Sequence, residues 1–189
     1  MVFELPLVLD QINITDPKEK EYLKLMLRLH FKEPKAYSRE SLKAHFTASA
    51  ILIDSAAENI LLLHHKKLDR WLQPGGHADG NKCLPEVSMK ELHEETNAVS
   101  AKLMNIIPFD LDIHTIPENK NEPEHQHYDL RFLWITDNLN EVRSNKESKG
   151  LKWIPVKELA EFTGGESSFV RIQKKIISIQ KNLLETQGA

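Results

Sequence analysis

The sequence predicts an α/β fold with a mixed β-sheet, preceded by an N-terminal helical extension. Short apolar runs bounded by turn residues recur between residues 45 and 155, which indicates strands. A charged segment at residues 84–96 and the C-terminal segment have the pattern of helices instead. Several strands around one internal helix, followed by a terminal helix, are typical of a layered α/β domain.

The helical extension is predicted to occupy residues 1–44, and the main domain residues 45–189. Thr15 and Asp16 stand before Pro17, which is typical of a helix start because Asp caps free N–H groups and Pro tolerates the first helical position. The residues that follow at three- and four-residue spacing, as on one face of a helix, are Leu23, Met26, Leu27 and His30. The polar segment KEPKAYSRES ends this helix, so we place the domain boundary after it.

The main domain is predicted to begin with a β-hairpin. HFTASAILID (45–54) and NILLLHH (59–65) are apolar runs separated by a short polar segment, which is the pattern of two strands joined by a turn. Pro74 and the two glycines after it end the next strand.

Three more strands and a terminal helix are predicted further along the chain. Apolar and polar residues alternate over 109–114 and again over 125–135, and LKWIP (151–155) is a last short strand. In the C-terminal segment the apolar residues with helical spacing, expected to pack on the sheet, are Phe169, Ile172, Ile176, Ile179 and Leu183.

Composition excludes several classes of protein. The 189 residues carry a net charge of −3, so the chain has no general electrostatic footprint for nucleic acid. Cys83 is the only cysteine, so neither an intramolecular disulfide nor a thiolate zinc cluster can form. The N-terminus lacks the basic region of a signal peptide, and no apolar run approaches the roughly 20 residues of a membrane span. These features predict a cytoplasmic protein without a membrane partner.

Three glutamates crowd the helix predicted at residues 84–96. At about 100° per residue, Glu91, Glu94 and Glu95 share one face, whereas Met89 and Leu92 fall on another face suited to burial. Like charges at this spacing repel, so the cluster is either a solvated acidic face or a cation site. Carboxylate oxygens are hard ligands, which favour Mg²⁺ or Mn²⁺ over Zn²⁺.

The segment around these glutamates resembles the signature of the Nudix hydrolase family. That signature runs from a glycine through an Arg-Glu pair, an apolar residue and a Glu-Glu pair to a final Gly-apolar pair. The corresponding residues here are Gly76, Lys90 and Glu91, Leu92, Glu94 and Glu95, and Asn97 and Ala98. The preceding WLQPGG is similar to the family's lead-in strand and turn, and the resemblance extends over about residues 45–160. It implies the family's α/β/α sandwich.

Three residues depart from the family pattern. Asn97 replaces a glycine at the helix end, where asparagine is the next-best residue for a left-handed cap. Lys90 replaces the arginine, and Lys82 replaces the glutamate that typically pairs with it, which leaves two like charges in place of an ion pair. Glu86 lies four residues before Lys90, so we expect it to act as a substitute brace.

The resemblance implies a hydrolase that splits the diphosphate bond of a small-molecule nucleotide. It implies dependence on Mg²⁺, with Mn²⁺ as an alternative to Mg²⁺. Glu91, Glu94 and Glu95 would hold the ions, with the Gly76 carbonyl as a further ligand. The general base would be Glu91 or Glu147. The resemblance leaves open whether the protein is a homodimer.

A polar strand face is the candidate for substrate binding. His125, His127, Asp129 and Arg131 alternate along one predicted strand, so they share a face. We expect His127, Asp129 and Arg131 to position substrate, with Arg131 contacting an anion. His77, after the double glycine, is expected at the mouth of the site. The alternative is an exposed sheet face, and two histidines of an H-x-H pair do not by themselves make a zinc site.

Two other functions remain open on the same fold. The lysine substitutions favour a catalytically weak nucleotide-binding or regulatory protein. An isomerase acting on isopentenyl diphosphate would use a cysteine, but Cys83 is poorly placed for this role in the loop of the signature. Hydrolysis at RNA ends is disfavoured because no basic surface with interleaved aromatic residues is evident.

Overall fold

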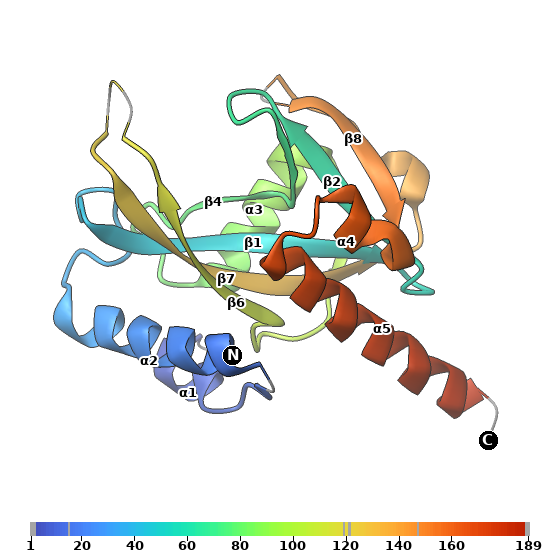
Figure 1. Cartoon of the computed structure of the whole chain (residues 1–189), viewed down its shortest axis with the longest axis horizontal. Coiled ribbons are helices and arrows are strands. Elements are labelled where there is room, and N and C mark those ends of the chain that lie inside the picture. The colour runs from blue at the N-terminus through green and yellow to red at the C-terminus, as the bar shows by residue number, and fades with distance from the viewer. Residues whose placement is uncertain (1–2, 15, 119, 121, 147, 188–189) are drawn as a thin grey trace. The chain divides into compact units, whose positions relative to one another are not determined.

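Eight strands and five α-helices are present in the computed structural model, which describes residues 3–14, 16–118, 120, 122–146 and 148–187 (Figure 1). In chain order the elements, with η for 3₁₀ helices, are α1 (Leu5–Leu9), α2 (Pro17–Lys32), β1 (Ala44–Asp54), β2 (Asn59–His65), β3 (Arg70–Leu72), β4 (Gly75–His77), α3 (Leu84–Thr96), β5 (Lys102–Leu103), β6 (Asp110–Ile116), β7 (His125–Thr136), η1 (Leu139–Glu141), β8 (Ser148–Pro155), η2 (Val156–Glu158), α4 (Leu159–Phe162) and α5 (Ser167–Gln187). The predicted α/β fold, with a mixed sheet and a helix ahead of it, is confirmed.

The chain divides into two units, each described by itself. Unit 1 comprises residues 1–50, 75–91 and 104–133, and unit 2 comprises the remainder. Elements β1, α3 and β7 run from one unit into the other along the chain.

In unit 1, strand β1 pairs with β4 and strand β6 pairs with β7, both antiparallel. Thr47 lies opposite His77, and Ser49 lies opposite Gly75. Along the second pair, the register runs from Asp110 opposite Arg131 to Ile116 opposite His125. The side chains of alternate residues therefore line a common face of each pair.

The N-terminal helices belong to unit 1, where α2 lies along β6 (Figure 1). Asp16 caps α2 as predicted, because its carboxylate accepts from the backbone N–H groups of Lys18 and Glu19 at 2.8 and 3.3 Å. Glu19 is fully buried and accepts the backbone N–H of Leu111 in β6 at 3.1 Å. The extension is thus anchored on a strand, and the boundary after residue 44 stays a prediction.

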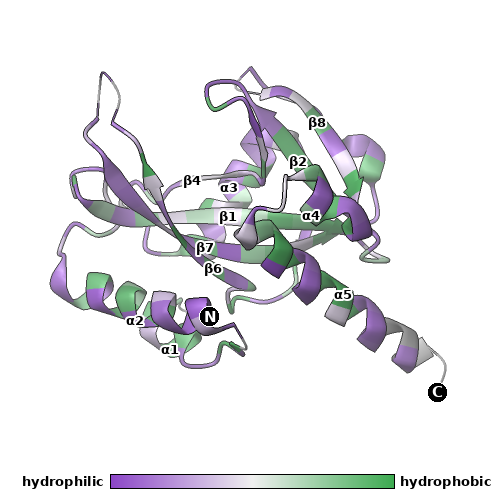
Figure 2. Ribbon diagram, viewed as in Figure 1, coloured by the Kyte–Doolittle hydropathy of each residue, from purple (hydrophilic) through white to green (hydrophobic). Residues whose placement is uncertain are grey.

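In unit 2, strand β2 is the central element. It pairs antiparallel with β3 and β8, and Ile60 lies opposite Ile53, which confirms the predicted hairpin. Figure 2 shows hydrophobic residues along β2 and at the start of α5. Of the five α5 side chains predicted to pack on the sheet, Phe169, Ile172 and Ile176 are buried and Ile179 is partly exposed, while the side chain of Leu183 lies outside the described part of the chain.

The described part of the chain has no helix with both the length and the apolarity that a membrane span requires.

Candidate functional site

Helix α3 carries the three predicted carboxylates and spans the predicted residues, Leu84–Thr96. Within one helix, Glu91, Glu94 and Glu95 project from the same side. Their exposure differs: the side chain of Glu91 is 16% exposed and Glu95 is buried, whereas Glu94 is exposed. A carboxylate pays a desolvation cost on burial unless a donor or cation compensates it. The helix therefore presents three carboxylates on one side, at different depths from the surface.

The predicted burial of Met89 is wrong, although that of Leu92 is confirmed. Met89 is 39% exposed, while Leu92 is fully buried. The buried stripe of α3 runs through Leu84, Ser88 and Leu92 at four-residue spacing, and Met89 falls outside it. The helical periodicity predicts which residues of α3 share a face, but it does not predict which of these faces is buried.

Gly76 and Glu91, both in unit 1, lie in direct contact. A Cβ atom at position 76 would be 2.5 Å from Cδ of Glu91, and 2.7 and 2.8 Å from its carboxylate oxygens. Only glycine therefore lets this carboxylate reach the backbone of β4. This contact brings together two of the predicted metal ligands.

Lys82 and Lys90, the two lysines of the signature, contact different residues. The ammonium of Lys90 lies 3.5 Å from Oε1 of Glu91, and the ammonium of Lys82 lies 5.9 Å from the ring centre of Tyr37. Glu86 accepts from the Asn81 amide at 3.3 Å and Lys90 contacts its chain neighbour Glu91, and the expected brace between Glu86 and Lys90 stays a prediction.

Asn97 ends α3 as predicted from the signature. Its φ of 58° is left-handed, and its N–H donates to the carbonyl of His93 at 2.9 Å.

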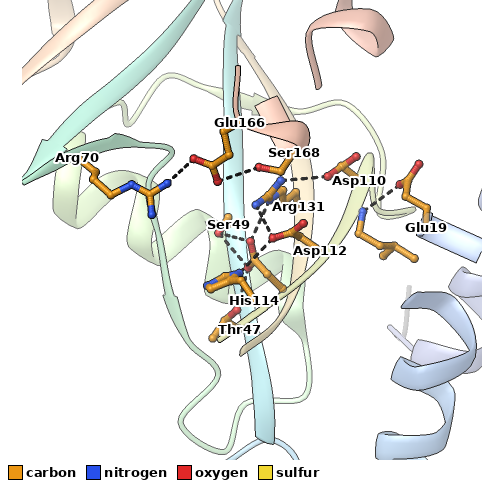
Figure 3. A network of polar contacts seen from close by, with 12 residues as sticks. Glu19, Thr47, Ser49, Arg70, Asp110, Asp112, His114, Arg131, Glu166 and Ser168 are labelled. Atoms are coloured by element: carbon orange, nitrogen blue, oxygen red, sulfur yellow. Dashed lines mark hydrogen bonds and ion pairs between the residues drawn. The ribbon is translucent and has the colours of Figure 1, made fainter. Parts of the chain in front are cut away.

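Arg131 lies at the centre of a buried ion network in unit 1 (Figure 3). Its Nε donates to Asp129 at 3.1 Å, Nη1 to Asp110 at 3.2 Å and Nη2 to Asp112 at 3.1 Å. Asp129 also accepts from the hydroxyls of Thr47 and Ser49, both at 2.9 Å. Burial opposes the charged form of Arg131, but the aspartates outweigh it and raise its pKa.

The network changes the expected roles of two residues. Arg131 is 3% exposed and Asp129 is 1% exposed, so they lie inside the unit rather than on an open face. Each guanidinium nitrogen is directed at a protein carboxylate. We therefore assign Arg131 and Asp129 to holding β1, β6 and β7 together, in place of the expected substrate contact.

His77 of β4 and His127 of β7 share a second polar cluster in unit 1. Their ring centres are 4.7 Å apart, and His45 and His125 lie beside them. Burial lowers the pKa of His77 to about 4 and also lowers that of His127, which keeps both rings neutral. Sequence reasoning missed His45, which lies 80 residues before His125. Its signal was the alternation of His45, Thr47 and Ser49 in a strand.

The other candidates contribute less. Glu147 lies outside the described residues, so its role as general base stays a prediction. Burial raises the pKa of the half-buried Cys83 thiol, which makes it a weaker nucleophile.

A family model described as the NUDIX domain matches residues 43–173 of the chain. A relative from Lactococcus lactis subsp. cremoris (strain MG1363), named "Probable DHNTP pyrophosphohydrolase", is 25% identical over 122 residues, 64% of this chain and 71% of that protein.

Two solved structures share the fold. A C. elegans Ap4A hydrolase binary complex has a TM-score of 0.58 at 16% identity, with 72% of this chain and 98% of that one covered. The E. coli dihydroneopterin triphosphate pyrophosphohydrolase has a TM-score of 0.56 at 15% identity, with 70% of this chain and 95% of that one covered. At these identities the likeness concerns the fold, and it confirms the α/β/α sandwich that the sequence predicted.

Proposed function

Because the chain belongs to the Nudix hydrolase family, we propose that it is a divalent-metal-dependent pyrophosphohydrolase. Its substrate would be a nucleoside diphosphate linked to another moiety, of the nucleotide sugar, ADP-ribose, dinucleotide or NTP type. The observation that carries this proposal is the contact of Glu91 with Gly76. A carboxylate held against a glycine backbone, one helical turn before two more carboxylates, provides the oxygen-rich surroundings that Mg²⁺ prefers.

The residues present fit a divalent ion. Glu91, Glu94, Glu95 and the Gly76 backbone would hold it, and the missing side chain at Gly76 leaves the room that the Glu91 carboxylate uses. A bound Mg²⁺ or Mn²⁺ supplies charge neutralisation of the diphosphate and a lowered pKa of bound water.

In the proposed hydrolysis, the side chains of the protein accept a proton and position the carboxylates. Glu91 is our first choice for the general base, and Glu147 is the second. The ammonium of Lys90 lies 3.5 Å from the Glu91 carboxylate.

We expect Gly76→Ala to reduce turnover by about 100-fold, since a displacement of about 1 Å at a catalytic group can have that effect. The added methyl group would meet the Glu91 carboxyl at 2.5–2.8 Å, and this flexible end would have to move away. The fold should persist because a side chain, not backbone, gives way. Steady-state rates and circular dichroism check both expectations.

Gly150→Ala is the matched control. A Cβ there would meet no atom of the described residues within 4 Å, so both activity and fold should stay near wild type. Unchanged turnover in Gly76→Ala would remove the main support for placing Glu91 in the site.

A second candidate function is nucleotide binding with negligible hydrolysis. The observation that favours it is the position of Lys82, which lies over Tyr37 instead of taking part in the family's ion pair. A panel of nucleotide sugars, ADP-ribose, dinucleoside polyphosphates, NTPs and DHNTP, assayed with Mg²⁺ for cleavage and by calorimetry for binding, separates the two. Cleavage supports the hydrolase, whereas tight binding without cleavage supports the regulatory protein.

A further inference from the structure

Four histidines of unit 1 converge from three strands. They are His45 of β1, His77 of β4, and His125 and His127 of β7, and each offers one ring nitrogen to a group whose members all lie within 4.8 Å of one another. The strand register produces this convergence. Thr47 lies opposite His77, and the N–H of Gln126 donates to the carbonyl of Lys43 at 2.9 Å, which sets the start of β7 beside the start of β1.

Two of the rings are oriented by backbone carbonyls. The Nδ1 of His45 lies 3.1 Å from the Ser41 carbonyl, and that of His125 lies 2.8 Å from the Pro123 carbonyl. A carbonyl only accepts, so each Nδ1 carries a proton, and the Nε2 of each ring faces the cluster. Metal-binding histidines have this arrangement, with the distal nitrogen held by a carbonyl.

Two of the four inward nitrogens lack a hydrogen-bond partner among the described residues. The Nε2 atoms of His45 and His77 are buried, and neither has a hydrogen-bond partner among the described residues. Buried polar atoms normally find a partner, so these two point to a ligand. The Nε2 atoms of His125 and His127 lie 3.2 Å apart, which is the separation of two ligands on one ion as well as that of a hydrogen bond.

The cluster lies in the interior of unit 1, because His45 is 3% exposed and His125 is 5% exposed. Arg39 of the same unit is already compensated, because its Nε donates to Asp79 at 2.8 Å in an ion pair.

The ligand type selects the metal. Four imidazoles suit Zn²⁺ and similar transition metals, unlike the carboxylate oxygens of α3, which suit Mg²⁺. With Zn–N bonds of about 2.0–2.1 Å, tetrahedral ligand atoms lie about 3.3 Å apart. The nitrogens of His125 and His127 already have this spacing. The others need only small ring movements from a separation of at most 4.8 Å.

We propose that His45, His77, His125 and His127 form a binding site for one divalent transition metal ion of the Zn²⁺ type. The ion would bind β1, β4 and β7 together at the end of β4 that follows Gly76. The site does not rest on the proposed hydrolase function, because its ligands are not the α3 carboxylates and it takes another class of metal.

The test is equilibrium binding of Zn²⁺ to the metal-stripped full chain. Wild type should bind one Zn²⁺ that remains in the Glu94→Gln variant, where the α3 carboxylates are impaired. The variants His77→Gln and His127→Gln should each lose about 100-fold or more in Zn²⁺ affinity, beyond the 10–100-fold typical of residues that only support a ligand. His64→Gln is the matched control, because His64 belongs to β2 and lies 2.8 Å from Asp69. It should bind Zn²⁺ as wild type does.

X-ray absorption of the wild-type Zn²⁺ complex keeps the proposal testable if the histidine variants fail to fold. The expected first shell is nitrogen at about 2.0 Å. A shell dominated by oxygen, no Zn²⁺ bound by wild type, or unchanged affinity in folded His77→Gln and His127→Gln would overturn the proposal. Each result is independent of Mg²⁺-dependent hydrolysis, so the failure of one proposal does not imply the failure of the other.

Discussion

Glu94→Gln is expected to lower turnover by about 10³-fold, in the range that the loss of a catalytic acid–base or charge-stabilising group produces. The substitution keeps the shape of the side chain but removes the charge that would hold a divalent ion. Glu94 is exposed on α3, so the neutral amide costs little stability. Initial rates at saturating Mg²⁺, together with a thermal melt, measure both effects.

Glu86→Gln is the control on the same helix. Its carboxylate is exposed and accepts from Asn81, on a side of α3 different from that of Glu91 and Glu95. It loses the same charge and should retain most of the activity. If both variants lose activity equally, the effect is one of overall charge and the assignment of Glu94 is wrong.

Arg131→Met should destabilise the protein by about 3–5 kcal/mol, the usual cost of removing one partner of a buried ion pair. Asp110 and Asp129 have at most 1% exposure and Asp112 has 7%, so removal of the guanidinium would leave their charges in a medium that solvates them poorly. The methionine fills the volume but donates nothing. Urea unfolding gives the change in free energy of unfolding.

Arg70→Met is the matched control for that loss. Arg70 pairs with Glu166, but its side chain is 58% exposed, so the substitution should cost less than about 1 kcal/mol. A similar small change in Arg131→Met would show that the buried network does not hold the strands of unit 1.

The local structure of the signature could be predicted from the sequence because it depends on spacing and backbone chemistry. The bounds of α3 follow from its helical pattern, and the left-handed φ of Asn97 follows from the preference of asparagine for that conformation. The shared face of His127, Asp129 and Arg131 follows from strand alternation.

The covered faces could not be predicted in the same way. Alternation groups Asp129 with Arg131 but does not reveal that β6 places Asp110 and Asp112 against the same guanidinium. Met89 is a second example. Periodicity predicts which residues of α3 share a face, but it does not show which face is covered, and Met89 is exposed.

Contacts between distant segments were also beyond the sequence. The histidine cluster joins residues 45, 77, 125 and 127, and the pairing of three strands decides which of them meet. Lys82 likewise lies over Tyr37, 45 positions earlier, although the signature directs attention to Lys90. The sequence identifies these residues, but the residues that they contact are determined by the fold.

The most direct test of the central claim is the cleavage rate of the nucleotide panel by metal-stripped wild-type protein as Mg²⁺ is added back. We predict no turnover without metal, a saturable rise with Mg²⁺ or Mn²⁺, and two phosphate-containing products from one diphosphate bond. Turnover that does not depend on metal, or no cleavage at any Mg²⁺ or Mn²⁺ concentration by folded protein, would contradict the account.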